Sequence, residues 1–114
     1  TWLGFVGDPA PVIALADVCT APSRAECFSL TVIEAMAAGV PCVGSAVGGI
    51  CEIIQSGVNG VLVRPEDPSA LARALMRVIV DSDYRRILGD RARRTVEQRF
   101  TRRRMVDETV ALLV

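Results

Sequence analysis

Short apolar runs alternate with helix-length segments through the first 63 residues, and this alternation constrains the fold more than any other feature. Four runs have the length and composition of strands, at residues 2–6, 18–21, 41–45 and 61–63. Segments with helical signals lie between them, at residues 11–17, 29–38 and 50–55. Alternating strands and helices form parallel sheets with helical cover. The sequence therefore predicts an α/β fold with a Rossmann-like parallel sheet.

The residues that follow position 65 predict helices only. Three are expected, at residues 69–80, 82–96 and 101–114, with Ser69 and Thr101 as N-caps of the first and the last. We interpret the chain as one partial domain, in which residues 1–64 form the sheet portion and residues 65–114 form the C-terminal helices. Because the chain starts inside a predicted strand, we expect it to be part of a longer protein.

Composition excludes several kinds of chemistry. The 114 residues include no histidine, which rules out Ser/His/Asp and Cys/His catalysis and the commonest metal ligand within this chain. The four cysteines lack the spacing of a zinc site, so no metal site is predicted. We expect free thiols, with Cys19 and Cys42 acting as small hydrophobes in strands, in a cytoplasmic protein.

Charge is balanced overall, with 13 basic and 13 acidic residues, but every basic residue is arginine. Many of the arginines lie in residues 91–104. This stretch is either a solvated helix face or a surface that contacts an anionic membrane at its periphery. Zero net charge and only 4% aromatic residues disfavour nucleic-acid binding.

The segment 22–41 carries the strongest functional pattern. It predicts a loop with Glu26, followed by a helix that starts near Ser29, contains Glu34 and is stopped by Gly39. The first turn of a helix has unpaired N–H groups that bind anions such as a diphosphate. Glu34 lies roughly 7.5 Å further along the axis, where a carboxylate can accept from both hydroxyls of a ribose. The alternative is that both glutamates are ordinary solvated surface residues.

Residues 22–49 closely resemble the donor-site signature of family 4 of the retaining glycosyltransferases, which have the GT-B fold and use nucleotide-activated sugars. The resemblance implies that Glu26 is the catalytic-site residue that contacts hydroxyls of the donor sugar, and that Glu34 binds the ribose. It also implies that the backbone amides of Phe28, Ser29 and Leu30 hold the diphosphate, without a metal or another cofactor. Cys27 departs from the family, which usually has glycine at that position.

A second departure concerns positive charge. The family neutralises the leaving diphosphate with an Arg and a Lys, whereas this chain has no lysine, and Arg24 is the only basic residue in positions 1–60. The resemblance also implies an acceptor-binding N-terminal domain that this chain does not contain. We therefore expect the isolated chain to lack transferase activity.

The resemblance implies the donor-binding part of an enzyme that transfers a sugar from a nucleotide-sugar to a hydroxyl of a glycan, lipid or small-molecule acceptor, with retention of anomeric configuration. Two alternatives stay open, a non-catalytic nucleotide-sugar-binding module and a GT-B nucleotide-sugar epimerase. The glycine turn at Gly48 and Gly49 has two interpretations as well. It either lets the backbone approach the donor or is a structural turn after the strand.

Overall fold

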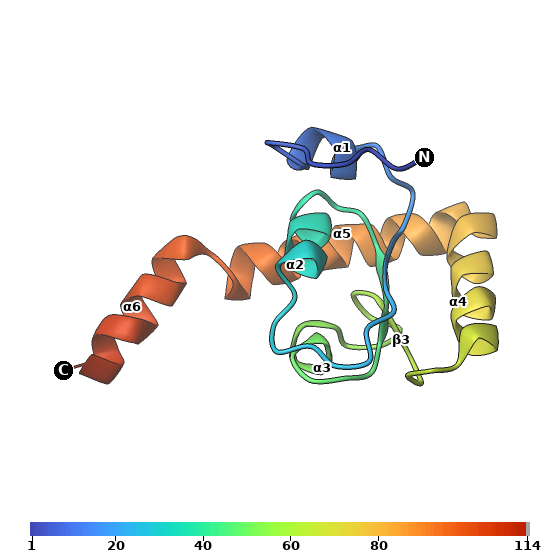
Figure 1. Cartoon of the computed structure of the whole chain (residues 1–114). Coiled ribbons are helices and arrows are strands. Elements are labelled where there is room, and N and C mark those ends of the chain that lie inside the picture. The colour runs from blue at the N-terminus through green and yellow to red at the C-terminus, as the bar shows by residue number, and fades with distance from the viewer. Residues whose placement is uncertain (114) are drawn as a thin grey trace.

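The computed structural model describes residues 1–113, and Figure 1 shows the order of the elements along the chain. The first part contains α1 (Ala10–Ala14), β1 (Cys19–Ala21), α2 (Leu30–Ala37), β2 (Cys42–Ser45), α3 (Ile50–Ile53) and β3 (Val61–Val63). The second part contains α4 (Pro68–Val80), α5 (Ser82–Arg99) and α6 (Arg102–Leu113). This is the predicted α/β arrangement, and the prediction of the fold class is confirmed.

The three strands form one parallel sheet in the order β1-β2-β3. Cys19 pairs with Cys42 at the start of the β1–β2 ladder, and Ser45 pairs with Val63 at the end of the β2–β3 ladder. All residues of the central strand β2 are buried, because it has a neighbour on each edge and helices on both faces. Since all the strands run in one direction, their carboxyl ends meet at a single edge of the sheet.

Alternate residues of β2 point to opposite faces of the sheet and join two different hydrophobic clusters. Cys42 belongs to a cluster with Val32 and Met36 of α2 and Ala92 of α5. Val43 belongs to the other cluster, with α4 and with Leu88 of α5. The long helix α5 therefore contributes to both clusters. Leu88, in its first half, packs in one cluster, and Ala92, in its second half, packs in the other.

Helix α2 has the expected end signals. Ser29 is its N-cap, with an extended backbone and a side chain that accepts from the amide of Val32. Gly39 follows the last turn with φ +75°, the left-handed conformation expected of a C′ glycine. The buried face of α2 begins after its first residue. Ala35 is fully buried and Leu30 is exposed, because the first turn of α2 extends beyond the edge of the core.

The C-terminal helices begin at residues that the sequence identified only in part. Thr101 caps α6, since its hydroxyl accepts from the amide of Arg104 at 3.2 Å. The prediction of Ser69 as an N-cap is wrong. Asp67 has that role, and its carboxylate accepts from the amide of Ala70 at 2.9 Å. Pro68 explains the earlier start, because a proline at the first helical position needs no hydrogen-bond acceptor.

The prediction of a strand at residues 2–6 is also wrong. Residues 1–9 form no helix or strand and contain only a bend at Gly7. Trp2 and Phe5 are 93% and 97% exposed. A strand requires a neighbour with which to exchange backbone hydrogen bonds. This segment does not pair with the open edge of β1, so its apolar sequence alone does not make it a strand.

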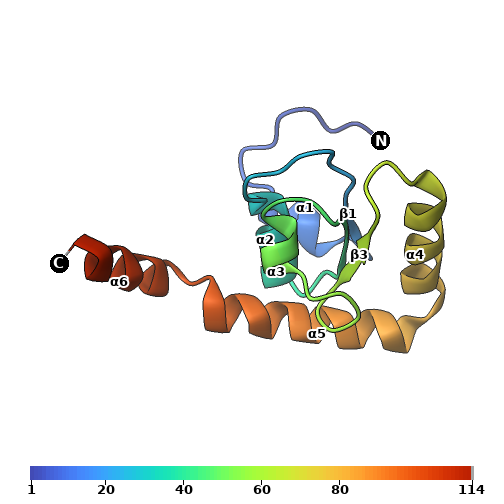
Figure 2. The same ribbon diagram turned by 90° about the horizontal axis from the view of Figure 1, so that it is seen from below.

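Figure 2 shows α5 lying along one side of the sheet and α6 continuing beyond the end of α5, away from the rest of the molecule. No residue of α6 is buried. The molecule is elongated as a result, with extents of 48 × 30 × 28 Å. Within residues 1–113, no helix has the combination of length and apolar character needed to cross a membrane.

Candidate functional site

The start of α2 presents backbone donors at the end of the loop that follows β1. The first backbone bond into the helix joins the amide of Ile33 to the carbonyl of Ser29 at 3.2 Å. Within residues 1–113, the amides of Phe28, Ser29 and Leu30 donate to no protein acceptor. The positive end of the helix dipole lies at this same end of α2. These are the three amides that the resemblance assigned to the diphosphate, and their binding of an anion stays a prediction.

The loop with Glu26 is held by the glycine turn after β2. The amide of Gly49 donates to the carbonyl of Glu26 at 3.0 Å. A Cβ atom on Gly48 would collide with the carbonyl oxygen of Glu26, and one on Gly49 would collide with that of Cys27. Gly48 also has φ +45°, which favours glycine. Of the two interpretations of this turn, these contacts support the structural one, because the turn packs against the backbone of the loop with Glu26.

Glu26 is half-buried, and the hydroxyl of Ser23 donates to its Oε2 at 3.2 Å. Cys27, the residue that departs from the family pattern, is exposed. Its carbonyl, by contrast, is one of the backbone groups that lie close to Gly49.

Glu34 lies in the middle of α2 and is exposed, on the side of the helix away from the buried residues Val32, Ala35 and Met36. Within residues 1–113, its carboxylate forms no ion pair or hydrogen bond with another side chain. The helical setting expected of Glu34 is therefore present. The cavities described below include neither Glu26 nor Glu34, so a cleft shared by the two carboxylates stays a prediction.

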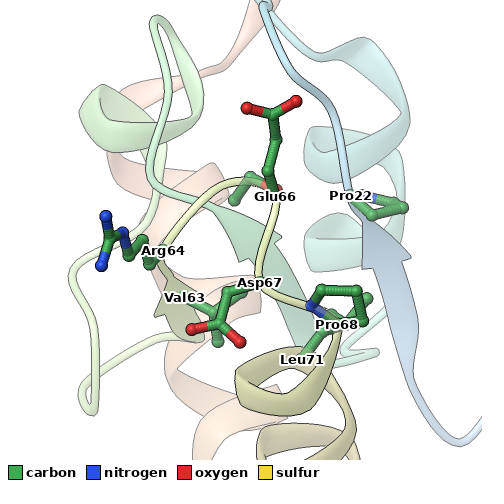
Figure 3. Close-up of a pocket in the computed structure, with 8 residues that line it drawn as sticks. Pro22, Val63, Arg64, Glu66, Asp67, Pro68 and Leu71 are labelled. Atoms are coloured by element: carbon green, nitrogen blue, oxygen red, sulfur yellow. The ribbon is translucent and has the colours of Figure 1, made fainter.

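A pocket of about 160 Å³ lies at the carboxyl edge of the sheet (Figure 3). It is lined by residues at or just after the ends of the three strands and in the first turn of α4: Pro22, Ser45, Val63, Arg64, Glu66, Asp67, Pro68 and Leu71. In Figure 3, Arg64 and Pro22 lie on opposite sides of this pocket. Ligands of open parallel sheets bind at this edge. Except for Pro22, sequence reasoning did not connect these residues with a site.

An ion pair between Arg24 and Glu66 lies at this pocket, which Glu66 lines. Nε of Arg24 lies 3.2 Å from Oε1 of Glu66, and both side chains are largely exposed. Glu66 has φ +57°, the only non-glycine residue in the described chain with a positive φ. Arg24, the sole basic residue of the first 60, is therefore paired with Glu66, while Arg64 lines the pocket itself.

A larger groove of about 330 Å³ lies between the start of α2 and α6. Phe28 and Leu30 line it, together with Ile33, Phe100, Met105 and other residues of α5 and α6. The rings of Phe28 and Phe100 meet edge to face, with their centroids 6.1 Å apart. The side chains of two predicted substrate-binding residues therefore face this apolar groove, while their backbone amides are those at the helix start. Among the described residues, no three of His, Cys, Asp or Glu form a group suited to a metal ion.

The parallel sheet, the open helix start and the pocket at the carboxyl edge define a Rossmann-like domain with its ligand-binding edge accessible. The family model described as "Glycosyl transferases group 1" matches residues 1–81. The chain belongs to this family.

The chain is similar to glycosyltransferases along almost its whole length. It is 36% identical over 107 residues to N-acetyl-alpha-D-glucosaminyl L-malate synthase of Bacillus anthracis, covering 94% of this chain and 28% of the relative. Its fold matches sucrose-phosphate synthase from Thermosynechococcus elongatus with a TM-score of 0.88 at 37% identity, over 92% of this chain and 26% of the other.

The fold also matches Anabaena HepE, solved in complex with UDP, with a TM-score of 0.89 at 30% identity. That match covers 96% of this chain and 31% of HepE. In each comparison the chain spans less than a third of the relative's length. The architecture is that of part of a GT-B C-terminal domain, as the sequence predicted.

Proposed function

We propose that this chain is the donor-binding part of a retaining glycosyltransferase of family 4, which transfers a sugar from a nucleotide-sugar to a hydroxyl of an acceptor. One observation carries the proposal: the three consecutive amides of Phe28, Ser29 and Leu30 lie at the start of α2 and donate to no acceptor in the described chain. An anionic diphosphate satisfies such amides and interacts favourably with the helix dipole. The similarity to HepE, which was solved with UDP, supports this assignment.

In this proposal the remaining groups have distinct roles. Glu26, fixed through its carbonyl by Gly49, contacts hydroxyls of the donor sugar close to the reacting bond. Glu34, farther along α2, accepts from the ribose hydroxyls. The diphosphate needs no metal ion, because helix amides and cations supply the positive potential. The acceptor, a glycan, lipid or small molecule, is bound mainly by a separate N-terminal domain of the whole protein.

Calorimetric titration of the chain with UDP and with GDP tests the site. We expect Glu34→Ala to weaken nucleotide binding by about tenfold or more, since hydrogen bonds to a charged group contribute about 1.5–3 kcal/mol. Glu52→Ala is the matched control, because Glu52 is an exposed helix glutamate on α3. Equal affinity of the wild type and both variants would contradict the assignment of Glu34.

A non-catalytic nucleotide-binding module is the second candidate, and the Arg24–Glu66 ion pair favours it for the isolated chain. With Arg24 paired to Glu66 and no lysine present, the chain has fewer free cations to stabilise the departing nucleoside diphosphate than the family pattern implies. We expect the chain, incubated with a nucleotide-sugar and an acceptor, to bind the donor without turnover. Turnover equal to that of a full-length family member would exclude the module.

We further propose that the protein is cytoplasmic and contacts anionic membranes at their surface through arginines of α5 and α6. Several of these arginines have acidic partners one turn away, including Arg93 with Glu97 and Arg104 with Glu108, which lowers the available charge. Co-sedimentation with vesicles tests the contact. Binding should increase with the anionic lipid content and decrease with salt. Equal sedimentation with neutral and anionic vesicles would contradict it.

A further inference from the structure

Two of the four cysteines occupy paired positions on neighbouring strands. Cys19 of β1 and Cys42 of β2 are register partners in the parallel ladder. Adjacent strands are about 4.8 Å apart, and paired residues point to the same face of the sheet. A disulfide requires Cα atoms between about 4.4 and 6.8 Å apart, so this pair lies within bonding range without a change of register.

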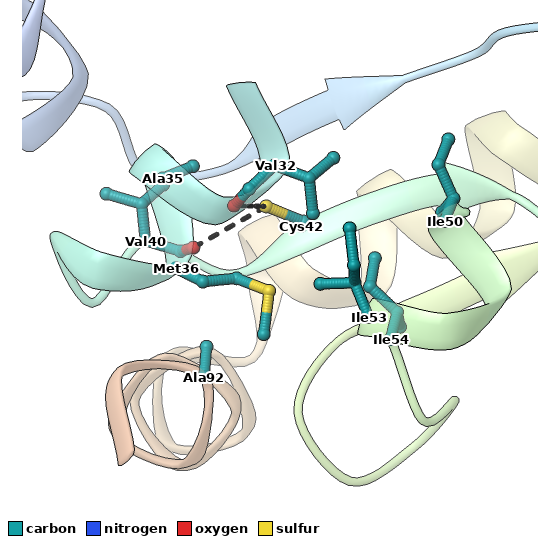
Figure 4. Packing of buried hydrophobic residues seen from close by; sticks show 9 residues of the cluster. All are labelled: Val32, Ala35, Met36, Val40, Cys42, Ile50, Ile53, Ile54 and Ala92. Carbon is teal, nitrogen blue, oxygen red and sulfur yellow. Dashed lines mark hydrogen bonds between the residues drawn. The ribbon is translucent and has the colours of Figure 1, made fainter. Parts of the chain in front are cut away.

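The two thiols differ in accessibility. Cys42 is completely buried, and its Sγ lies 3.8 Å from the carbonyl oxygens of both Val32 and Val40 (Figure 4). Cys19 is only half-buried and lies on an edge strand of the sheet. An oxidant in solution therefore reaches Cys19 first, and Cys42 is shielded from everything except its neighbour.

The thiols also differ in acidity. A hydrogen bond with Cys42 lowers the pKa of Cys19, and this effect outweighs the opposing effect of burial. The same hydrogen bond and burial raise the pKa of the Cys42 thiol. Since the thiolate is the reactive form of cysteine, Cys19 is the more reactive of the two.

We propose that Cys19 and Cys42 are a redox-active pair that closes to a reversible disulfide when the protein meets a peroxide. The Cys19 thiolate attacks one oxygen of hydrogen peroxide; the O–O bond breaks, and Cys19 becomes a sulfenic acid as one water forms. The Cys42 sulfur then attacks the Cys19 sulfur, the S–O bond breaks, and a second water leaves with the Cys42 proton. The two thiols lose two electrons in total, and the peroxide gains them.

The strand geometry explains why this bond is reversible. Side chains paired in a parallel ladder keep roughly the strand spacing of about 4.8 Å, whereas the Cβ atoms of a disulfide are about 3.5–4.5 Å apart. Closure pulls the two strands together, and strained disulfides are the easily reduced ones. The bond joins the two ends of the segment that contains Glu26, Ser29 and Glu34. Cys27 and Cys51 are exposed and have no such register.

Trypsin separates the two cysteines, because it cleaves after arginine and Arg24 lies between Cys19 and Cys42 in the sequence. No other basic residue precedes Arg64. A Cys27→Ser/Cys51→Ser variant is treated with hydrogen peroxide, quenched with catalase, unfolded in the presence of N-ethylmaleimide and digested with trypsin. We expect a peptide that ends at Arg24 to be linked to the peptide that begins at Ala25. Dithiothreitol should separate them.

Two controls make the result specific. Adding Cys42→Ala in the same background should abolish the link and leave Cys19 over-oxidised. The link should form more slowly when peroxide is added to the chain already unfolded in urea. If the serine variant does not fold, as judged by circular dichroism, the wild type is used instead. Fragmentation of its linked peptides in a mass spectrometer then identifies the cysteine that is bonded to Cys19. Recovery of both thiols alkylated, or of Cys19 as a sulfinic acid with Cys42 free, would overturn the proposal.

Discussion

At the scale of single residues, the glycines after β2 determine where Glu26 lies. Gly49 donates to the carbonyl of Glu26 and leaves no space for a Cβ atom beside the backbone of Cys27. We predict that Gly49→Ala destabilises the chain by about 1–3 kcal/mol, because backbone must move to admit the methyl group. Urea denaturation followed by circular dichroism measures this change.

The matched control is Gly7→Ala, where a Cβ atom has no neighbour within 4 Å and the backbone is not in the left-handed region. It should change the free energy of unfolding by less than about 1 kcal/mol. Equal effects of the two substitutions would mean that the loop moves freely over the turn.

The sequence predicted the local features of this site and missed the non-local ones. Ser29, Gly39 and Pro41 signal the ends of α2 through backbone chemistry that acts over a few residues. The pocket at the carboxyl edge depends instead on strand order, which brings Val63, Asp67 and Pro22 around one cavity. The spacing of these residues along the sequence does not predict that they line one pocket.

At the scale of elements, α2 and α5 cross with their backbones in close approach. A Cβ atom on Gly89 of α5 would collide with the carbonyl oxygen of Gly39, just after α2. Alanine normally stabilises a helix interior by about 1 kcal/mol relative to glycine. We predict the opposite here, a loss of about 1–3 kcal/mol in Gly89→Ala, measured by urea denaturation.

Asp90→Ala is the control on the same helix, since Asp90 is the next residue and is exposed. It should leave the free energy of unfolding within about 0.5 kcal/mol of the wild type. A stabilised Gly89→Ala chain would show that the helices can separate to admit a methyl group.

The two wrong element predictions have one cause. Residues 2–6 have strand-like composition, and Ser69 is a good capping residue, but in each case the surroundings of the segment decided the outcome. The first has no strand beside it, and the second follows Pro68, which already starts the helix under the Asp67 cap. Local propensity is a weak guide where tertiary pairing or an adjacent residue decides.

At the scale of the whole molecule, α6 is attached to the fold without being part of its core. It projects beyond α5 and has no buried residue (Figures 1 and 2). We predict that removal of residues from 102 onward changes the free energy of unfolding of the rest by less than about 1 kcal/mol. Ala92→Asp, which places a carboxylate in the core, should cost about 3 kcal/mol or more. A comparable loss on removal of α6 would show that the groove beside Phe28 contributes to stability.

The position of Trp2 has a practical consequence for the unfolding measurements. It is the only tryptophan of the chain, and its indole is already in water in the native state. Its emission spectrum should therefore change little when the chain unfolds in urea, and tryptophan fluorescence would not detect a cooperative unfolding transition. For the same reason, a blue shift in that emission would be a clean optical signal that something has covered the N-terminal segment.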